Sequence, residues 1–135
     1  MAENPTWLAV VAAAIRDDRG RLLLQRALPG KPHAGRWEFP GGKVESGEHP
    51  RVALGREVLE EVGLALDESA MRPAGFADER GARAIVLILY ECPLWEGEPR
   101  SLEGQAWGWF TAREAAGLAL SAMDRALLHG LLHGP

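Results

Sequence analysis

The stretch from Gly42 to Leu64, GKVESGEHPRVALGREVLEEVGL, has the pattern of an amphipathic helix preceded by a glycine turn. Pro50 carries the fixed φ that suits the first helical position, and Gly63 is typical of a helix C-terminus. The apolar residues between them recur at helical spacing and are expected to pack on a sheet while the glutamates face outward: Val52, Leu54, Val58, Leu59 and Val62. The stretch therefore predicts a helix from about Pro50 to Gly63 that covers a β-sheet.

Three glutamates of this helix form a candidate metal site. Glu57, Glu60 and Glu61 stand three and four positions apart, so a helix places them on one face with Cβ atoms roughly 5–6 Å apart. Like charges at this spacing repel one another, and Arg56 is the only base close by. Because carboxylate oxygens are ligands of hard divalent cations, the cluster predicts a bound metal ion. The glycines of the preceding turn let the backbone approach a phosphate or an ion.

This stretch resembles the Nudix box, which runs glycine, five residues, Glu, seven residues, Arg-Glu, an aliphatic residue, any residue, Glu-Glu, any residue, glycine and an aliphatic residue. Its fixed positions are filled here by Gly42, Glu48, Arg56, Glu57, Val58, Glu60, Glu61, Gly63 and Leu64. A full match over 23 residues is far more specific than a lone glycine-rich triplet. The run WEFPGGK at 37–43 is similar to one branch of the family, the MutT-type nucleoside triphosphate pyrophosphohydrolases.

The resemblance implies an α/β Nudix fold, which is an α/β/α sandwich with a mixed sheet, and residues 1–135 are expected to form a single Nudix domain. It also implies Mg²⁺-dependent hydrolysis of a nucleoside triphosphate to monophosphate and pyrophosphate, with Mn²⁺ able to replace Mg²⁺. The leading substrate is 8-oxo-dGTP, and the alternative is CTP or a 5-modified pyrimidine triphosphate. A non-enzymatic Nudix module that binds a nucleotide is a further hypothesis, but such a module has no need for three mutually repelling acids.

The resemblance assigns roles to individual residues. The implied metal ligands are the carbonyl of Gly41 and the side chains of Glu57, Glu60, Glu61 and Glu103. Glu103 is included because WEGEP followed by LEGQAW, residues 95–107, is similar to a MutT-type loop that adds a glutamate to the cluster. Glu57 and Glu103 both remain candidates for the general base. Arg56 is expected to orient the catalytic carboxylates through a salt bridge reaching Glu48, while Gly42, Glu48 and Gly63 are structural.

Residues outside the helix are candidates for binding the nucleotide. Arg26 lies near the end of a predicted strand, where its own positive charge could bind a phosphate group. The WEFPGGK run adds Glu38, Phe39 and Lys43. The resemblance also implies that the base is read at the start of the last helix, where Asp124 could accept from a guanine-type N–H edge. An alternative alignment puts Met123 at the reading position, which would give a less discriminating pocket.

The rest of the chain alternates strand and turn patterns. A β-hairpin is predicted from Trp7 to Leu28 around the turn at 17–20. Further strands are predicted at 71–77, 82–90 and 105–110, the second of them central in a sheet. Thr111 and Ser121 are expected to cap two helices, the first with a capping box and the second running to His133.

Composition narrows the class of protein. The 135 residues carry a formal net charge of −4, which argues against nucleic-acid binding because such binding relies on clustered Lys and Arg. The charge is uneven, with seven bases against four acids up to Lys43, so an anionic substrate could be held by the N-terminal third. We expect the partner to be a small nucleoside triphosphate and the protein to be a monomer or a weak homodimer.

The cellular compartment is predicted from the membrane-spanning and secretion signals that the sequence lacks. No run of about 18 apolar residues is present, and MAENPTWLAV has no basic leader ahead of an apolar stretch, so neither a membrane span nor a secretion signal is predicted. Cys92 is the only cysteine and cannot form an internal disulfide. These features predict a cytoplasmic protein.

Overall fold

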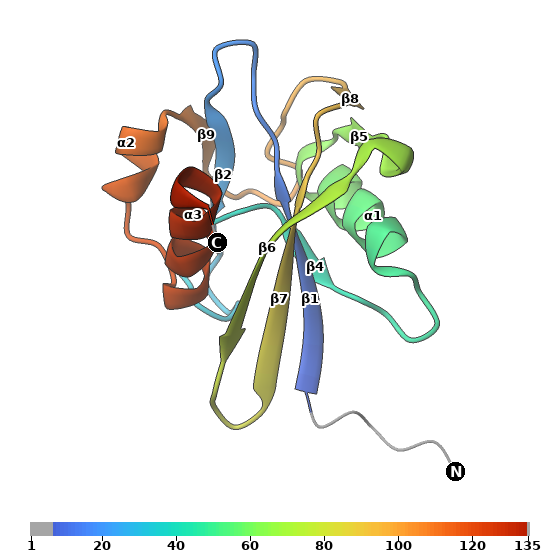
Figure 1. The fold of residues 1–135 in the computed structure, drawn as a ribbon, viewed down its shortest axis with the longest axis vertical. Helices are drawn as coiled ribbons and strands as arrows, with labels where there is room; N and C mark the ends of the chain where they lie inside the picture. Colours follow the sequence, from blue (N-terminus) through green and yellow to red (C-terminus); the bar gives the residue numbers. More distant parts are fainter. Residues whose placement is uncertain (1–6, 135) are drawn as a thin grey trace.

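The computed structural model describes residues 7–134 (Figure 1). Residues 1–6, which bear on the expectation of no leader, lie outside the described residues, as does Pro135. The strands are β1 (Trp7–Ala14), β2 (Leu22–Arg26), β3 (Trp37–Glu38), β4 (Gly41–Lys43), β5 (Ala65–Leu66), β6 (Arg72–Glu79), β7 (Ala84–Glu91), β8 (Trp95–Glu96) and β9 (Trp107–Phe110). The helices are α1 (Pro50–Val62), α2 (Ala112–Ala116), α3 (Ala122–His133) and the 3₁₀ helix η1 (Glu68–Ala70). Within the described part of the chain, no helix is both long and apolar enough to span a bilayer.

A mixed four-stranded sheet lies between two helical layers. Its strand order is β4-β1-β7-β6, in which β1 and β7 are parallel and the other pairs are antiparallel. An antiparallel sheet, β3-β2-β9, and a short pair, β5-β8, complete the strands. Figure 1 shows α1 on one side of the four-stranded sheet and α3 on the other. The predicted α/β/α arrangement with a mixed sheet is therefore confirmed.

Each face of this sheet has its own apolar core. Side chains alternate between the two faces of a strand, so Val11 and Ala13 of β1 pack toward α1 while Ala12 and Ala14 pack in the core that includes α3. Apolar residues on both faces of β1 explain why its sequence is continuously apolar instead of alternating with polar residues. The interior position of β7 between β1 and β6 confirms the prediction of a central strand.

Helix α1 begins and ends where the sequence predicts. Pro50 is in its first turn, and the His49 side chain caps it by accepting from the Arg51 N–H at 3.1 Å. Gly63 ends the helix in the left-handed region, at φ 77°, where its N–H donates to the Leu59 carbonyl at 3.1 Å. Glycine adopts this conformation without the steric cost of a Cβ.

The predicted apolar face of α1 was partly wrong. Val52 and Leu59 are 44% and 52% exposed, whereas Ala53 and Glu61 are buried beside Leu54, Val58 and Val62. The buried stripe therefore follows positions 54, 58, 61 and 62, the i, i+4, i+7 and i+8 spacing of a helix, and Val52 and Leu59 fall outside it. Glu61 does not face outward as expected, because it lies within this stripe.

The predicted hairpin from Trp7 to Leu28 was wrong beyond its turn. Near the turn, the Leu23 N–H donates to the Ile15 carbonyl and the Asp17 N–H donates to the Arg21 carbonyl, both at 3.0 Å. The strands then diverge, because β4 and β7 occupy the two edges of β1. Strand β2 pairs instead with β3 and β9.

The remaining boundaries differ from the predictions by a few residues. Strand β6 includes Asp78 and Glu79, which lie beyond the predicted end of this strand at residue 77. The capping box of α2 is confirmed: the Thr111 hydroxyl accepts from the Glu114 N–H at 3.1 Å, and the Thr111 N–H donates to the Glu114 carboxylate at 2.9 Å. Ser121 caps α3, which ends at His133 as predicted.

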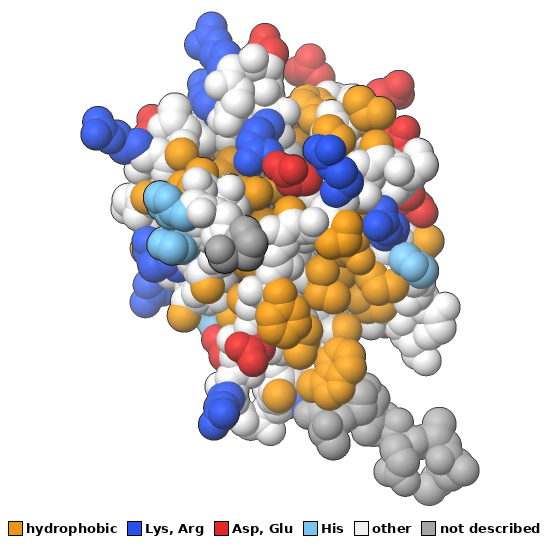
Figure 2. All heavy atoms as spheres, in the orientation of Figure 1, with side chains coloured by type: hydrophobic (Ala, Val, Ile, Leu, Met, Phe, Trp, Pro, Cys, Tyr) orange, Lys and Arg blue, Asp and Glu red, His pale blue; other side chains and the backbone are white. Residues whose placement is uncertain are grey.

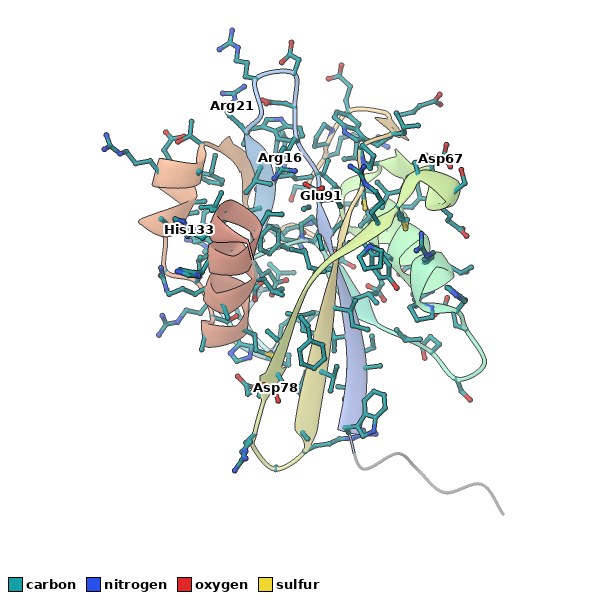
Figure 3. All side chains as sticks on the ribbon, viewed as in Figure 1. Arg16, Arg21, Asp67, Asp78, Glu91 and His133 are labelled. Carbon is teal, nitrogen blue, oxygen red and sulfur yellow. The ribbon has the colours of Figure 1, made fainter. Side chains whose placement is uncertain are left out.

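Two features of the surface lie at the ends of β1 and β7, away from the region where the helices pack on the sheet. Figure 2 shows hydrophobic side chains gathered where β1, β6 and β7 extend past α1, and Trp7 and Phe76 are 47% and 63% exposed. At the other end of β1 and β7, Arg16 forms an ion pair with Glu91 (Figure 3). This pair links the segment after β1 to the end of β7.

Candidate active site

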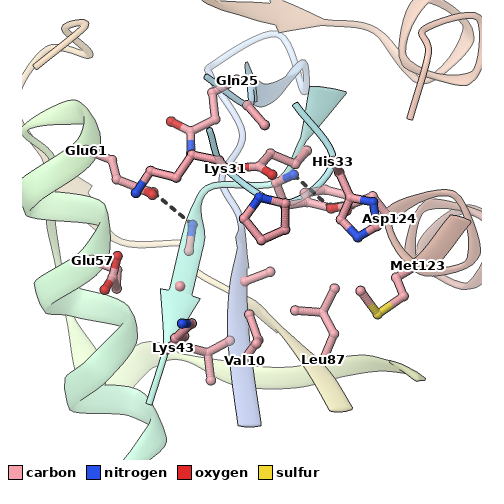
Figure 4. A pocket seen from close by; sticks show the side chains of 18 of the residues that line it. Val10, Gln25, Lys31, His33, Lys43, Glu57, Glu61, Leu87, Met123 and Asp124 are labelled. Atoms are coloured by element: carbon pink, nitrogen blue, oxygen red, sulfur yellow. Dashed lines mark hydrogen bonds between the residues drawn. The ribbon is translucent and has the colours of Figure 1, made fainter. Parts of the chain in front are cut away.

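One cavity of about 360 Å³ lies between the sheet, α1 and α3 (Figure 4). Its floor includes Val10 of β1 and Leu87 of β7. The acids that line it come from five segments of the chain: Glu38, Glu45, Glu57 and Glu61 of α1, Glu103, and Asp124. Its basic residues are Arg26, Lys31, His33 and Lys43. The fold therefore gathers opposite charges around one cavity with a partly apolar floor.

Glu61 is the most buried acid of α1. It is 9% exposed, and its Oε1 accepts from the Gly41 N–H at 3.0 Å (Figure 4). Burial raises the pKa of Glu61 to about 8, and the charges of Glu57 and Glu38 add to this shift. A buried carboxylate with other acids near it is costly unless a cation neutralises it.

Glu57 and Glu38 also have raised pKa values. Burial is the main cause for both, and it raises the pKa of Glu38 to about 7 with a further contribution from Asp124. Gly42 leaves space for the Glu57 carboxylate in this position, because a Cβ on Gly42 would lie 2.4 Å from its carboxylate carbon and displace it. The glycine turn thus makes room for this carboxylate at the cavity wall.

Arg56 links the acids of the Nudix-like stretch as expected. It donates to both oxygens of Glu48, from Nε at 2.8 Å and from Nη2 at 2.9 Å, and from Nη1 to Glu57 at 3.0 Å. The guanidinium holds the pKa of Glu48 down at about 2 and its own pKa is raised by the same contact. Arg56 and Glu48 do not line the cavity. Glu48 holds Arg56, and Arg56 orients the Glu57 carboxylate from the side away from the cavity.

Glu60 differs from the other two predicted metal ligands of α1. Its side chain is 54% exposed, lies 3.4 Å from Arg56 Nη1 and is absent from the cavity lining. Its assignment as a metal ligand stays a prediction.

The donor set suits a hard divalent cation. Among residues 7–134, no three Asp, Glu, His or Cys side chains are already gathered closely enough to hold a metal ion. Glu57, Glu61 and Glu103 nevertheless border the same cavity, repel one another and offer oxygen donors, which is the chemistry that Mg²⁺ or Mn²⁺ prefers. Gly41 lies directly beside Glu61. These residues would hold the cation, and the Glu103 side chain is exposed to the solvent.

Two buried glutamines in the site were missed from the sequence. Gln105 donates from Nε2 to the Glu61 carbonyl at 2.8 Å and to Gln25 Oε1 at 3.0 Å, and its Oε1 accepts from the Glu103 N–H at 3.0 Å. Gln25 donates in turn to Glu38 at 3.3 Å. A glutamine inside the apolar run LLLQ was the available signal, because buried polar side chains need partners. The pair joins the loop of Glu103 to the end of α1.

Both candidates for reading the base line the other end of the cavity. Asp124 is 6% exposed; its Oδ1 accepts from the Phe39 N–H at 3.0 Å and its Oδ2 accepts from the Ser121 hydroxyl. Burial raises the pKa of Asp124. Met123 lies beside it in Figure 4. Arg26, Glu38, Phe39 and Lys43 line the same cavity, so every predicted nucleotide-binding residue is brought to it.

Buried acids predict an unusual pH dependence of stability. Without divalent cations, the free energy of unfolding should fall as pH rises from about 4.5 to about 8, because Glu61 and Glu38 bind protons more tightly when folded. This contribution is complete below the unfolded pKa and is lost as pH rises through the folded pKa. Glu61→Gln should flatten the dependence. Urea unfolding in EDTA across this range measures it, and an unchanged slope in Glu61→Gln would refute the assignment.

Comparison with known proteins agrees with this geometry. The family model described as a NUDIX domain matches residues 5–129. The 8-oxo-dGTP diphosphatase of Haemophilus influenzae is 33% identical over 126 residues, which are 93% of this chain and 92% of that protein. The CTP pyrophosphohydrolase of Escherichia coli is 36% identical over 125 residues, which are 93% of this chain and 91% of that protein. A crystal structure of a MutT NUDIX hydrolase from Burkholderia pseudomallei has a TM-score of 0.82 and 32% identity, covering 91% of this chain and 96% of that one.

The chain therefore belongs to the Nudix family. It is a MutT-type hydrolase that acts on phosphoanhydride bonds. Nudix hydrolases generally need a divalent metal ion, and the oxygen donors of the cavity agree with that requirement.

Proposed function

We propose that the chain is an Mg²⁺-dependent nucleoside triphosphate pyrophosphohydrolase whose preferred substrate is 8-oxo-dGTP. Water and the triphosphate would give a monophosphate and pyrophosphate. The observation that carries the proposal is one continuous cavity, which joins the carboxylates of α1 to the base-reading candidates at α3. The enzyme would act in the cytoplasm as one Nudix domain and remove oxidised guanine nucleotides before they enter DNA.

The acidic end of the cavity suits the triphosphate. A bound divalent cation neutralises charge on phosphate oxygens and makes water a stronger nucleophile. Glu57 and Glu61 would hold it, and Glu103 or Glu57 would take the proton of the attacking water. Arg26 and Lys43 line the same cavity and would bind phosphate oxygens as cations.

The other end suits a planar base. Its floor and side include Val10, Leu87 and Met123, and Asp124 is the acid beside them (Figure 4). A carboxylate accepts hydrogen bonds, and an oxidised guanine presents several N–H donors on one edge. The Asp124 carboxylate could also accept from cytosine, but cytosine presents one amino group, so this argument supports a cytosine nucleotide less strongly.

Relatives of the chain support both substrates. The Haemophilus influenzae relative is named for 8-oxo-dGTP and the Escherichia coli relative for CTP. The deciding experiment compares kcat/KM for 8-oxo-dGTP, dGTP and CTP by pyrophosphate release with Mg²⁺. The proposal expects 8-oxo-dGTP to lead CTP by about 10-fold or more, which corresponds to one good hydrogen bond in the discrimination. A higher kcat/KM for CTP than for 8-oxo-dGTP would instead support the alternative substrate, a pyrimidine triphosphate.

Asp124 provides a sharper test of base reading. Asp124→Ala should raise KM for 8-oxo-dGTP by about 5- to 150-fold, equivalent to about 1–3 kcal/mol, because a donor of the base loses its acceptor. Asp124→Asn is the matched variant, since its amide oxygen can still accept from Phe39 while one acceptor is replaced by a donor. Steady-state kinetics on 8-oxo-dGTP and CTP measure the effect. Equal slowing of both nucleotides, or loss of preference in Met123→Ala alone, would remove Asp124 from this role.

A further inference from the structure

His33 has a backbone conformation that its sequence does not favour. Its φ is 60°, and no other non-glycine residue among the described residues has a positive φ. Hydrogen bonds fix the loop around it: the Arg36 N–H donates to the His33 carbonyl at 2.9 Å, and the Gly35 N–H donates to the Ala27 carbonyl at 2.8 Å. A positive φ is uncommon for any residue with a Cβ, and such conformations concentrate at functional sites.

The imidazole lies at the base end of the cavity. His33 lines the cavity, and Figure 4 shows its ring next to Asp124 and near Met123. When protonated, the imidazole lowers the pKa of the buried Asp124 carboxyl against the larger effect of burial. His33 therefore adds a planar aromatic side chain to the place where the base is expected.

Glu79 holds the imidazole from outside the cavity. Its Oε1 lies 3.5 Å from His33 Nε2, and both side chains are about one third exposed, at 34% for His33 and 31% for Glu79. Glu79 is in β6 and pairs in register with Ile85 of β7, which itself lines the cavity. A partly exposed ion pair adds little to stability. Stability alone therefore does not account for a histidine held in a strained conformation.

We propose that His33 is a nucleobase-binding residue that contacts the base through its imidazole ring, oriented by Glu79. The inference rests on the proposed nucleotide cavity but not on which base is preferred. An aromatic ring stacks on any planar base, and it would enclose the base together with the apolar side chains of Val10 and Leu87. Asp124 would read the edge of that base, while His33 would cover its face.

The test is binding of product nucleotides in EDTA, which isolates the base end from metal and catalysis. Dissociation constants for 8-oxo-dGMP and CMP are measured by calorimetry for the wild type, His33→Gly, His33→Asn and Glu79→Gln. His33→Gly should raise the Kd of the better ligand by about 10-fold, as expected for lost stacking on one base. His33→Asn should share this loss, because Asn tolerates the left-handed backbone but lacks the ring. Glu79→Gln should give a smaller loss.

Thermal unfolding separates this role from a structural one. Glycine adopts φ 60° without strain, so His33→Gly should have a Tm equal to or above that of the wild type while binding more weakly. Matched controls are His129→Ala, an exposed histidine of α3 outside the cavity, and Asp78→Asn, the neighbour of Glu79 on the opposite face of β6. Both should bind as the wild type does.

Each outcome decides the proposal. An unchanged Kd in His33→Gly would overturn it. A lower Tm in His33→Gly, together with a binding loss no greater than that of Glu79→Gln, would also overturn it, because His33 would then serve only to stabilise the loop. A wild type that prefers CMP and loses CMP binding in His33→Gly would keep the assignment of His33 while the preference for oxidised guanine fails. A wild type that binds neither nucleotide would overturn both proposals.

Discussion

Glu57→Gln is expected to lower kcat by about 10²-fold or more, since it removes one of the anionic oxygen donors that would hold the divalent cation. The substitution is nearly isosteric. The room that Gly42 leaves for the side chain is kept, and the amide oxygen can still accept from Arg56 Nη1. Pyrophosphate release at saturating nucleotide and Mg²⁺ measures the effect. Glu60→Gln tests the predicted ligand role of the exposed neighbour in the same assay.

The control for Glu57→Gln is Glu68→Gln. Glu68 is exposed on η1 and lies outside the cavity, so its activity should equal that of the wild type. Full activity in Glu57→Gln at ordinary Mg²⁺ concentrations would exclude Glu57 from both metal binding and proton transfer. A loss that is recovered at much higher Mg²⁺ would place its contribution in metal affinity.

Glu103→Gln is expected to lower kcat by about 10²- to 10⁴-fold with little change in KM, which is the range of a general base. Glu103 lies far from the box in sequence, yet it lines the same cavity and its charge acts on Glu57 and Glu38. The hydrogen bond from its N–H to Gln105 fixes the backbone of its loop. Steady-state kinetics at several pH values give kcat and KM separately.

The same kinetics separate the roles that Glu103 could have. Unchanged kcat in Glu103→Gln would return proton transfer to Glu57. A raised KM with unchanged kcat would make Glu103 a substrate-binding residue. Gln105→Ala should reproduce part of the kcat loss, because it removes the contact that positions the loop without changing the carboxylate itself.

The local part of the site was predictable from the sequence. Helix α1, its Gly63 end, and the contact of Arg56 with Glu48 follow from spacing, because a helix fixes which residues are neighbours over a few turns. The burial of Glu61 was not predictable in this way. From the sequence alone, a glutamate within the apolar stripe is expected to be exposed, and only the position of the sheet that covers it shows that it is buried.

Contacts between distant segments were the part that sequence reasoning missed. Gln25 and Gln105 are 80 positions apart and meet only because β2 and β9 pair. The hairpin of β1 and β2 looked plausible because a turn cluster separates two apolar runs, but a turn does not decide which strands pair beyond it. His33 lies in a polar loop whose sequence carries no sign of the cavity.

Product analysis shows whether the protein cleaves a nucleoside triphosphate in a metal-dependent reaction that releases pyrophosphate. The wild type is incubated with 8-oxo-dGTP in Mg²⁺ or in EDTA, and the products are separated by chromatography. We expect equal amounts of 8-oxo-dGMP and pyrophosphate in Mg²⁺, negligible turnover in EDTA, and recovery when Mg²⁺ or Mn²⁺ is added back. Full turnover in EDTA, or 8-oxo-dGDP and orthophosphate as the products, would contradict it.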